Sequence, residues 1–240
     1  RPFRRQFIIG PRPVPVYEDC RIAAVGDGAS LSYCPELPVA TAEDRSGERW
    51  YILGSPLQSD PARGTPIEEI GRATTEQVFE RTDTWAGRWV LVGGGGIHMD
   101  ASGLLGCYYT RISGNVWISS SVAPLKETLD LEPFPNVRLR YGARIDWYPP
   151  PRTRHPQIRQ LLVSQTLRLD GSVHPRPILA PVEPGLDAPE VIEAVRLHYE
   201  TALRSAAALG KPLWLGLTGG LDSRLILALA HRTDTSLTTY

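Results

Sequence analysis

The 240-residue sequence is poor in sulfur and carries no net charge. It has 3 cysteines and 1 methionine, and its 26 basic side chains balance 26 acidic ones. Cys20, Cys34 and Cys107 are odd in number and lack the Cys-x-x-Cys spacing of a zinc site, so we expect reduced thiols in a cytoplasmic protein. A neutral chain without a long basic run also argues against binding to nucleic acid.

Long apolar stretches are missing as well. No run approaches the roughly 18 residues of a membrane-spanning helix, and the cationic start of the chain lacks the apolar segment of a signal peptide. We therefore expect no contact with a membrane. The five histidines show no paired spacing, which argues against a metal site built on imidazoles. The 42% of hydrophobic residues suffices for one large or two modest cores.

Short strand-like segments fill most of the first 175 residues. Trp85 to Val92 predicts a strand, and the four glycines of 93–96 predict a hairpin tip rather than a phosphate loop, because no helix pattern follows them. The prolines within 7–15 favour an edge strand or a linker there. His98 and Asp100 share one face of the returning strand, and we interpret both as solvated. A last strand pair is predicted over 161–175.

Three segments have the apolar spacing of helices. We predict helices from Pro66 to Arg81, from Val122 to Leu129, and from Pro189 to about Leu209. Glu68 and Glu69 suit the solvated start of the first helix, where carboxylates complement the dipole.

The most informative segment lies near residue 220. Leu213 to Leu217 predicts a short strand covered on both faces, and Ser223 to about Ala230 predicts a helix. Between them, Gly219-Gly220 permits positive φ or the close approach of a ligand. A strand–glycine turn–helix unit directs free backbone N–H groups and the positive helix end at one point, which makes an anion site. An ordinary turn, with Asp222 as the N-cap, is the simpler interpretation of the same residues.

The loop resembles the pyrophosphate loop, Ser-Gly-Gly-x-Asp-Ser, of the ATP pyrophosphatases, most closely that of the asparagine synthetase family. The resemblance implies an ATP and pyrophosphate site at eight positions: Leu217, Thr218, Gly219, Gly220, Leu221, Asp222, Ser223 and Arg224. Thr218 keeps the hydroxyl of the usual Ser. Asp222 would hold Mg²⁺. Arg224 departs from the second Ser of asparagine-forming members, and it could contact a phosphate or mark another branch.

This resemblance implies the chemistry of a ligase. In the family, ATP adenylates a carboxylate with release of pyrophosphate, and an amine then attacks the acyl-adenylate to form an amide and AMP. The implied cofactors are ATP and Mg²⁺, and the implied partners are a small-molecule carboxylate and amine, or a peptide. Few residues follow the loop, so we expect the chain to be the front part of a longer enzyme. The sequence leaves the oligomeric state open, a homodimer included.

An earlier segment is similar to the amino-terminal glutamine amidotransferase domain of the same family. Asp100 to Tyr109, followed by Trp117 to Lys126, matches a turn leading to Tyr-Tyr, a strand and the start of a helix. The implied fold class is a four-layer αββα amidotransferase-like (Ntn-type) domain of the α+β class over residues 1–180. Residues 181–240 would hold a linker helix and the first β-loop-α unit of a truncated α/β ATP-pyrophosphatase domain, of the adenine nucleotide α-hydrolase type.

The resemblance fails at the residues of glutamine hydrolysis. An active domain of this type uses a Cys at its mature amino terminus, where this chain has Arg1, and the three cysteines present are internal. The family's Asn-Gly-Glu-Ile-Tyr-Asn-like glutamine segment is replaced by Leu53 to Ser59, which has neither the Asn-Gly pair nor the Glu. We therefore expect the domain to lack glutaminase activity.

Two rival functions stay open. One is an intramolecular amide cyclase, similar to the β-lactam synthetases or the lasso-peptide cyclases, and the altered glutamine segment and Arg224 favour it. The other is a non-catalytic scaffold that retains only the fold. Failure of the full-length protein to bind ATP with Mg²⁺ would favour the scaffold.

Overall fold

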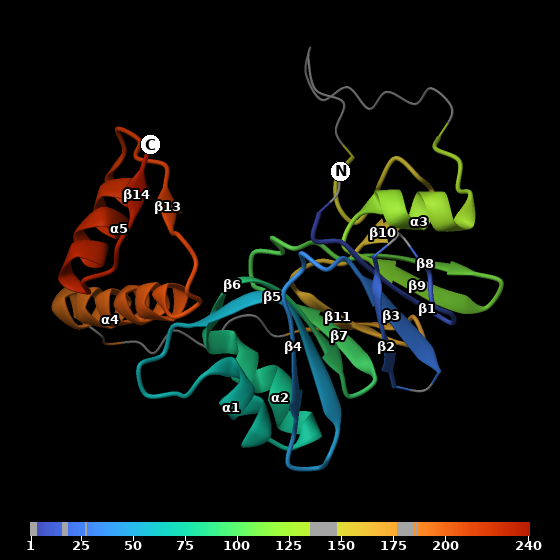
Figure 1. Cartoon of the computed structure of the whole chain (residues 1–240), viewed down its shortest axis with the longest axis horizontal. Helices are drawn as coiled ribbons and strands as arrows, with labels where there is room; N and C mark the ends of the chain where they lie inside the picture. Colours follow the sequence, from blue (N-terminus) through green and yellow to red (C-terminus); the bar gives the residue numbers. More distant parts are fainter. Residues whose placement is uncertain (1–3, 16–18, 27, 135–147, 177–184, 186) are drawn as a thin grey trace.

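Two six-stranded sheets lie face to face, with helices on both outer sides (Figure 1). The computed structural model describes residues 4–15, 19–26, 28–134, 148–176, 185 and 187–240. The sandwich is followed by a smaller unit that contains the glycine loop. The expected four-layer αββα arrangement is therefore confirmed for the first part of the chain. None of the helices in the described part has the length and apolar character needed to cross a bilayer.

The first sheet is antiparallel throughout and has the order β10-β8-β9-β1-β3-β2. Its strands are β1 (Phe7–Gly10), β2 (Arg21–Val25), β3 (Ala29–Tyr33), β8 (Tyr108–Ile112), β9 (Asn115–Ser119) and β10 (Arg159–Gln160). The prediction of an edge strand or linker over 7–15 is wrong, because β1 is an interior strand and fully buried. It ends before Pro11, so every β1 residue has an N–H for pairing.

The second sheet has the order β12-β11-β7-β6-β5-β4, again with antiparallel pairs. Its strands are β4 (Val39–Glu43), β5 (Arg49–Gln58), β6 (Trp85–Gly93), β7 (Gly96–Met99), β11 (Gln165–Arg168) and β12 (Val173–Pro175). The hairpin tip predicted from the glycine run is confirmed. Gly94 and Gly95, at its centre, have φ of 54° and 68°, which glycine adopts without strain.

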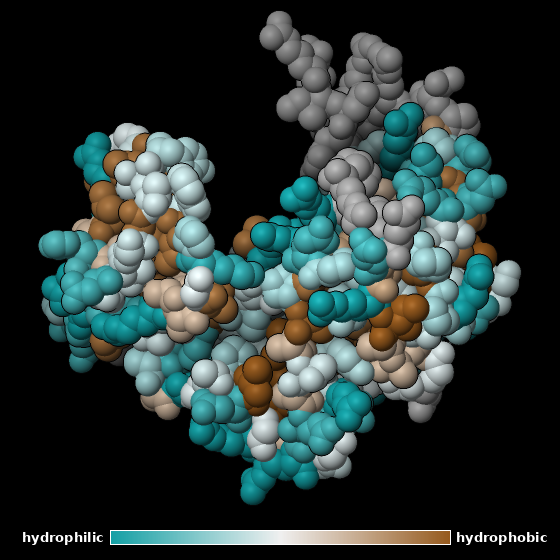
Figure 2. All heavy atoms as spheres, viewed as in Figure 1, coloured by the Kyte–Doolittle hydropathy of each residue, from teal (hydrophilic) through white to brown (hydrophobic). Residues whose placement is uncertain are grey.

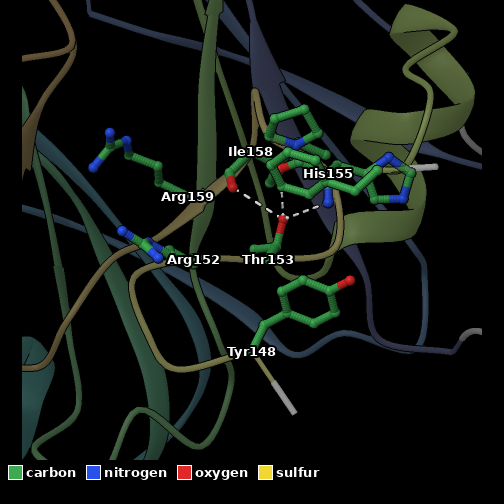
Figure 3. A pocket seen from close by; sticks show the side chains of 8 residues that line it. Tyr148, Arg152, Thr153, His155, Ile158 and Arg159 are labelled. Carbon is green, nitrogen blue, oxygen red and sulfur yellow. Dashed lines mark hydrogen bonds between the residues drawn. The ribbon is translucent and has the colours of Figure 1, made fainter. Parts of the chain in front are cut away.

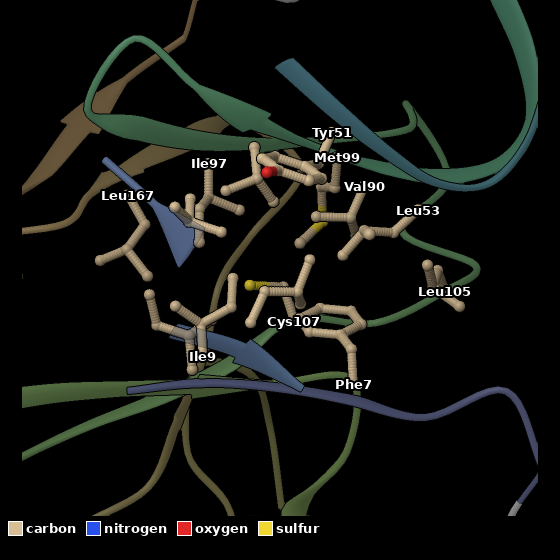
Figure 4. Close-up of a cluster of buried hydrophobic side chains, with 14 of the residues drawn as sticks. Phe7, Ile9, Tyr51, Leu53, Val90, Ile97, Met99, Leu105, Cys107 and Leu167 are labelled. Carbon is tan, nitrogen blue, oxygen red and sulfur yellow. The ribbon is translucent and has the colours of Figure 1, made fainter. Parts of the chain in front are cut away.

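Three hydrophobic clusters hold the layers together. The largest lies between the sheets and draws on both, with Ile9 and Cys107 facing Leu53, Val90 and other buried side chains (Figure 4). A second fills the space between the outer face of β5 and β6 and the helices of residues 66–81. A third lies between the first sheet and the helix of residues 122–129. The sandwich thus buries apolar side chains on both faces of each sheet.

The helix predicted from Pro66 to Arg81 is two helices, α1 (Pro66–Gly71) and α2 (Thr75–Arg81). The prediction missed the break because the local capping signal outweighs the apolar period: Thr74 and Gln77 form a capping box that starts α2 anew. A one-turn 3₁₀ helix (Thr82–Thr84) follows α2. Helix α3 (Val122–Leu129) has the predicted bounds.

Three polar residues that we predicted to be solvated are buried instead. Glu69 accepts hydrogen bonds from the side chains of Gln58 and Trp85. Asp100 accepts hydrogen bonds from the backbone N–H groups of Trp89, Ser102 and Leu104. These bonds compensate the carboxylate for the loss of water on burial. His98 stacks on Phe79, and burial, aided by the charge of Arg176, lowers its pKa to about 3.

The second unit consists of α4 (Ala188–Ala207), β13 (Trp214–Leu215), α5 (Leu221–Arg232) and β14 (Thr238–Thr239). The predicted helix over 189–209 is confirmed, and Asp187 caps it with a capping box. Helix α4 lies at the end of β5 (Figure 1), where Ser205 Oγ donates to the carbonyl of Gln58 at 2.9 Å. The expected boundary near residue 180 lies outside the described residues.

Candidate functional site

The glycine loop leaves the carboxyl end of β13 and enters the amino end of α5. Strand β13 pairs in parallel with β14, and the ladder is extended by Leu217 N–H, which donates to the carbonyl of Tyr240 at 3.0 Å. The predicted strand–loop–helix is present, and β14 adds a second strand that makes it a βαβ unit. Helix α5 begins at Leu221, two residues before the predicted start. The loop therefore lies where the positive end of α5 faces outward.

The amino end of α5 has no side-chain cap. Its N-cap residue is Gly220, whose φ is −76°, and among the described residues no side chain accepts the N–H of Leu221, Asp222 or Ser223. The N–H groups of a helix's first turn have no partner inside the helix, so an uncapped end suits an anion. The alternative in which Asp222 is the N-cap is wrong, because Asp222 lies inside the helix. The dipole of this twelve-residue helix places partial positive charge at its amino end.

Neither glycine of the loop adopts left-handed backbone, and there is open space around both of them. Gly219 and Gly220 both lie outside the positive-φ region, so that part of the sequence argument is wrong. A Cβ placed on Gly219 would have nothing within 4 Å, and one on Gly220 would meet only Thr218 Oγ1 at 3.4 Å. A side chain there would occupy the open space in front of the helix end. The space in front of the helix end is therefore open.

Two hydroxyls tie the loop to the helix. Ser223 Oγ donates to the carbonyl of Thr218 at 3.2 Å and accepts the Thr218 N–H at 3.2 Å. Thr218 Oγ1 lies 3.2 Å from Ser223 Oγ and accepts the Gly220 N–H at 3.3 Å. Ser223 is buried and Thr218 is exposed. Ser223 therefore orders the loop, whereas the Thr218 hydroxyl is at its surface, within reach of a ligand.

Two charged residues flank the loop. Arg224 Nη2 donates to the carbonyl of Gly219 at 3.0 Å, which places its guanidinium beside the glycines. Asp222 is exposed in the first turn of α5. In the described part of the chain no group of three His, Cys, Asp or Glu side chains could hold a metal ion. A cation at Asp222 would thus need further ligands from outside these residues, and phosphate oxygens are the hard ligands that Mg²⁺ takes.

Apolar side chains around the loop are exposed, contrary to the prediction that β13 is covered on both faces. The exposed fraction is 66% for Trp214, 42% for Leu217 and 80% for Leu221. Figure 2 shows apolar residues gathered over this unit. The predicted strand is present over Trp214–Leu215, but it is not covered on both faces, and of the described helices α4 and α5 contact one another here. The loop therefore stands on a thinly covered support.

A charge cluster joins the two helices of this unit, and the sequence reasoning missed it. Glu200 on α4 is buried and accepts hydrogen bonds from Arg196 and from Arg232 of α5, the latter at 3.1 Å. Arg204 lies 3.4 Å from its other oxygen. The hydrogen bond from Arg196 is the main cause that lowers the pKa of Glu200. The i, i+4 spacing of residues 196, 200 and 204 was the available signal.

The start of β1 carries no thiol within the described residues. Ser120 Oγ accepts the Phe7 N–H at 3.1 Å and donates to the Gln6 side chain at 2.7 Å, so a serine fixes this strand end. Cys107 is fully buried, and desolvation raises its pKa to about 12, which keeps it a thiol. Cys34 is also buried. A fully buried thiol with a raised pKa, as at Cys107, is a poor nucleophile.

The segment of Leu53 to Ser59 continues as strand rather than forming a loop. Strand β5 runs through it to Gln58, paired with β6 along its length. Gly54 and Gly87 make this pairing possible, because a Cβ on either would come within 2.3 Å of a carbonyl oxygen on the other strand. At its end, the Ser59 carbonyl lies 2.8 Å from His198 Nδ1 of α4. This segment therefore supports the second unit.

A separate cavity of about 360 Å³ lies on the α3 side of the sandwich (Figure 3). Thr153 Oγ1 donates within it to the carbonyls of His155 and Ile158, at 2.9 and 3.0 Å. These bonds close the turn that precedes β10. The cavity is not part of the glycine loop, and sequence reasoning did not predict it.

The chain matches known proteins only at the level of solved structures. No protein-family model and no curated protein matches the chain. Among solved structures, it is similar to one described as the allosteric regulatory enzyme of purine biosynthesis (8% identity, TM-score 0.42). It is also similar to the glutamine phosphoribosylpyrophosphate amidotransferase from B. subtilis complexed with ADP and GMP (8% identity, TM-score 0.41). The match covers 99% of this chain but 59% of either structure, less than two thirds of their length.

Proposed function

We propose that the chain is part of an ATP-dependent ligase that forms an amide bond, with residues 217–224 as its pyrophosphate site. The observation that carries the proposal is the uncapped amino end of α5, placed at the carboxyl end of β13. In open α/β sheets this is where ligands bind. The exposed Thr218 hydroxyl and the open space before Gly219 and Gly220 complete a cradle for an anion.

The chemistry that suits this cradle is carboxylate activation. A substrate carboxylate oxygen attacks the α-phosphorus of ATP, and the bond from that phosphorus to the bridging oxygen breaks to release pyrophosphate. Charge grows on the departing pyrophosphate, where the N–H groups of α5 and the Thr218 hydroxyl would donate hydrogen bonds. Each charge-assisted hydrogen bond contributes about 1.5–3 kcal/mol. An amine then attacks the acyl carbonyl, and AMP departs.

Asp222 and Arg224 are assigned complementary roles in this proposal. Asp222 would hold Mg²⁺, which neutralises charge on the phosphate oxygens when it is bound. Arg224 already contacts the Gly219 carbonyl, so its guanidinium would stiffen the loop and add positive charge beside the phosphates. Ser223 would act through the loop and not on the ligand, because its hydroxyl is buried and used by Thr218.

We further propose that the sandwich is an amidotransferase-like domain that does not hydrolyse glutamine. Two observations support this. The buried thiols of Cys34 and Cys107 lie inside the sandwich and away from its surface. The segment from Leu53 to Ser59 is occupied as strand and as a contact for α4.

An intramolecular cyclase is the second candidate, and it uses the same loop with an amine supplied by the substrate itself. The observation that favours it is again the strand of Leu53 to Ser59, since a cyclase has no use for glutamine-derived ammonia. The two candidates differ in substrate and not in adenylation. Both predict AMP and pyrophosphate as products.

The test is the release of AMP and pyrophosphate by the full-length protein, with aspartate and either glutamine or ammonium. AMP with ammonium alone supports asparagine-type synthesis without glutaminase activity, and AMP with glutamine overturns our interpretation of residues 53–59. If neither gives AMP while a peptide or amino-acid derivative does, the cyclase is supported. Failure to bind ATP with Mg²⁺ in any arm would indicate a non-catalytic scaffold.

The loop assignment has its own matched pair of variants. Asp222→Asn removes the carboxylate from the loop, and we expect AMP formation to fall by about 100-fold or more while the fold is kept. Glu127→Gln makes the same chemical change on the exposed face of α3 and should leave the rate unaltered. Unchanged AMP release by Asp222→Asn would contradict the assignment.

A further inference from the structure

A cavity of about 740 Å³ lies where the second unit meets the sandwich. Its walls come from the start of β4, the middle of β5, the turn before α1 and the last turns of α4. In Figure 1 the turn before α1 and helix α4 lie near the end of β5, and the start of β4 pairs with its middle. Its volume is within the range of about 300–1,000 Å³ typical of small-molecule sites. It lies away from the glycine loop, and nothing argued for it depends on the proposed ligase activity.

The lining is largely apolar. The side chains that give it this character come from four separate elements, and they include Val39, Ile52, Pro56, Ile67 and Leu209. Ile67 and Leu209 are 47% and 44% exposed, so the wall continues to the mouth of the cavity. A ligand that fills this space would gain about 25 cal/mol for each square ångström of apolar surface that it covers.

Acceptor groups around the cavity are already used. The Glu68 carboxylate accepts the Thr65 N–H at 2.8 Å as part of the α1 capping box. The Gly64 carbonyl accepts from the Gln58 side chain at 3.0 Å. The Gln58 carbonyl accepts from Ser205, which is the contact that fastens α4 to β5. Each of these three acceptors thus already receives one hydrogen bond from the protein.

Donor groups, in contrast, are in excess. Arg63 pairs with Asp60 through Nε at 3.1 Å, whereas its buried Nη1 makes no hydrogen bond within the described part of the chain and has only the Glu69 carboxylate nearby, at 3.7 Å. Thr201 Oγ1 is also buried without a hydrogen-bond partner among the described residues. The exposed Lys211 has neither a hydrogen bond nor an ion pair with the described residues. A group that brings acceptors would satisfy these donors.

We propose that this cavity binds a small organic anion with an apolar body, such as an aryl or alkyl carboxylate or sulfonate. The body lies against the apolar wall, and the anionic group faces Arg63, Thr201 and Lys211. Because the wall includes residues of both β5 and α4, an occupant also fastens the second unit to the sandwich. The cavity is thus a ligand-sensitive joint between the two parts of the chain.

The test uses two fluorescent probes that share one ring system. 8-Anilinonaphthalene-1-sulfonate carries the anionic group, and N-phenyl-1-naphthylamine lacks it. We expect the sulfonate to bind with one-to-one stoichiometry and about tenfold more tightly than the neutral amine. Lys211→Gln should remove most of that preference and leave binding of the amine unchanged. Equal affinity of the two probes would overturn the assignment of an anion.

A second set of variants locates the binding site. Ala208→Trp puts a large side chain at the α4 wall and should weaken both probes by about tenfold or more, whereas Ala208→Ser should keep the affinities of the parent chain. Leu221→Ser and Leu225→Ser remove exposed apolar side chains of α5 and serve as controls. Loss of binding in the α5 variants, with none in Ala208→Trp, would place the probes on the exposed apolar surface and overturn the proposal.

Discussion

The sandwich and the second unit are stabilised in different ways. Side chains in three clusters are buried from both faces of each sheet in the sandwich. Among the described residues from 187 onward, Leu229 and Ala230 are the only hydrophobic side chains in the buried class. What joins α4 to α5 instead is the charge cluster at Glu200. Apolar burial fixes the larger part, and ion pairs with a few hydrogen bonds fix the smaller one.

The difference teaches where the chemistry is placed. The candidate phosphate loop is on the part with less burial, whereas the sandwich supplies a rigid base through β5. Elements of low local stability are the ones free to rearrange around a ligand. We therefore expect ligands to change the second unit and to leave the sandwich as it is. Four measurements test this contrast, from the largest expected effect to the smallest.

The first compares one leucine from each part. Leu53 is 0% exposed in the main cluster, and Leu53→Ala should lower the free energy of unfolding by about 2–5 kcal/mol through lost contacts and a cavity. Leu225 is 49% exposed on α5, and Leu225→Ala should change the same quantity by less than about 0.5 kcal/mol. Urea unfolding measures both. Equal losses would show that the two parts depend on burial alike.

The second adds pH. Because the pKa of His98 falls from 6.5 in the unfolded chain to about 3 in the folded one, its contribution is present in full above pH 6.5. It is lost as the pH falls from 6.5 toward 3, since only the unfolded chain takes up the proton. The expected loss is about 1.4 kcal/mol per pH unit in that window.

The matched control for this pH dependence is His98→Leu. Between pH 6.5 and 4.5, the unfolding free energy of the parent should fall by about 2.3 kcal/mol relative to that of the variant. A difference that stays constant over that range would contradict the assignment of a neutral buried imidazole. The effect belongs to the sandwich, so hydrogen exchange in α5 should not follow it.

The third acts on the second unit alone. Glu200→Gln leaves Arg196, Arg204 and Arg232 without their shared carboxylate, and like charges then face one another. We expect amide hydrogen exchange in α4 and α5 to accelerate by roughly tenfold, with β5 and β6 unchanged. Glu193→Gln removes the exposed partner of Arg196 and leaves Glu200 in place, so it should accelerate exchange much less. An equal acceleration in the sandwich would show that the units are one cooperative body.

The fourth concerns the joint between them. Ser205→Ala removes the hydrogen bond to the Gln58 carbonyl, at an expected cost of about 1 kcal/mol in the docking of α4. Exchange near residue 205 should rise while the loop at residue 220 keeps its behaviour. If the loop changes as well, the docking of α4 controls the order of the phosphate site.

Much of this fold could be predicted from the sequence because local signals and tertiary structure agree. The glycine hairpin, helix α3 and the strand–loop–helix near residue 220 follow from turn chemistry and apolar period. Sequence pattern failed where burial depends on distant partners. The sequence pattern indicates a solvated Asp100, because the Trp89 N–H that it accepts comes from the neighbouring strand of the hairpin.

The candidate site was predictable in position and less so in detail. The order of residues 217–224 placed the loop at a helix start, but only the structure shows that Ser223 is spent on Thr218 and that the glycines keep negative or extended φ. The i, i+4 spacing could have indicated the pairs of Glu200 with Arg196 and Arg204, but its contact with Arg232 depends on the packing of α5 on α4. The cavity beside β5 is likewise a product of tertiary contact.

The interior place of β1 has a consequence for the synthesis of the protein. Its first residue, Phe7, is tied to Ser120 across a sequence separation of 113 residues. At a translation rate of about 5–20 residues per second, the strand therefore waits roughly 5–20 s on the ribosome before its second neighbour emerges. During that time one edge of the segment Phe-Ile-Ile lacks its partner, and unpaired apolar edges favour association with other chains. A chaperone that holds the first residues of this chain would act in that interval.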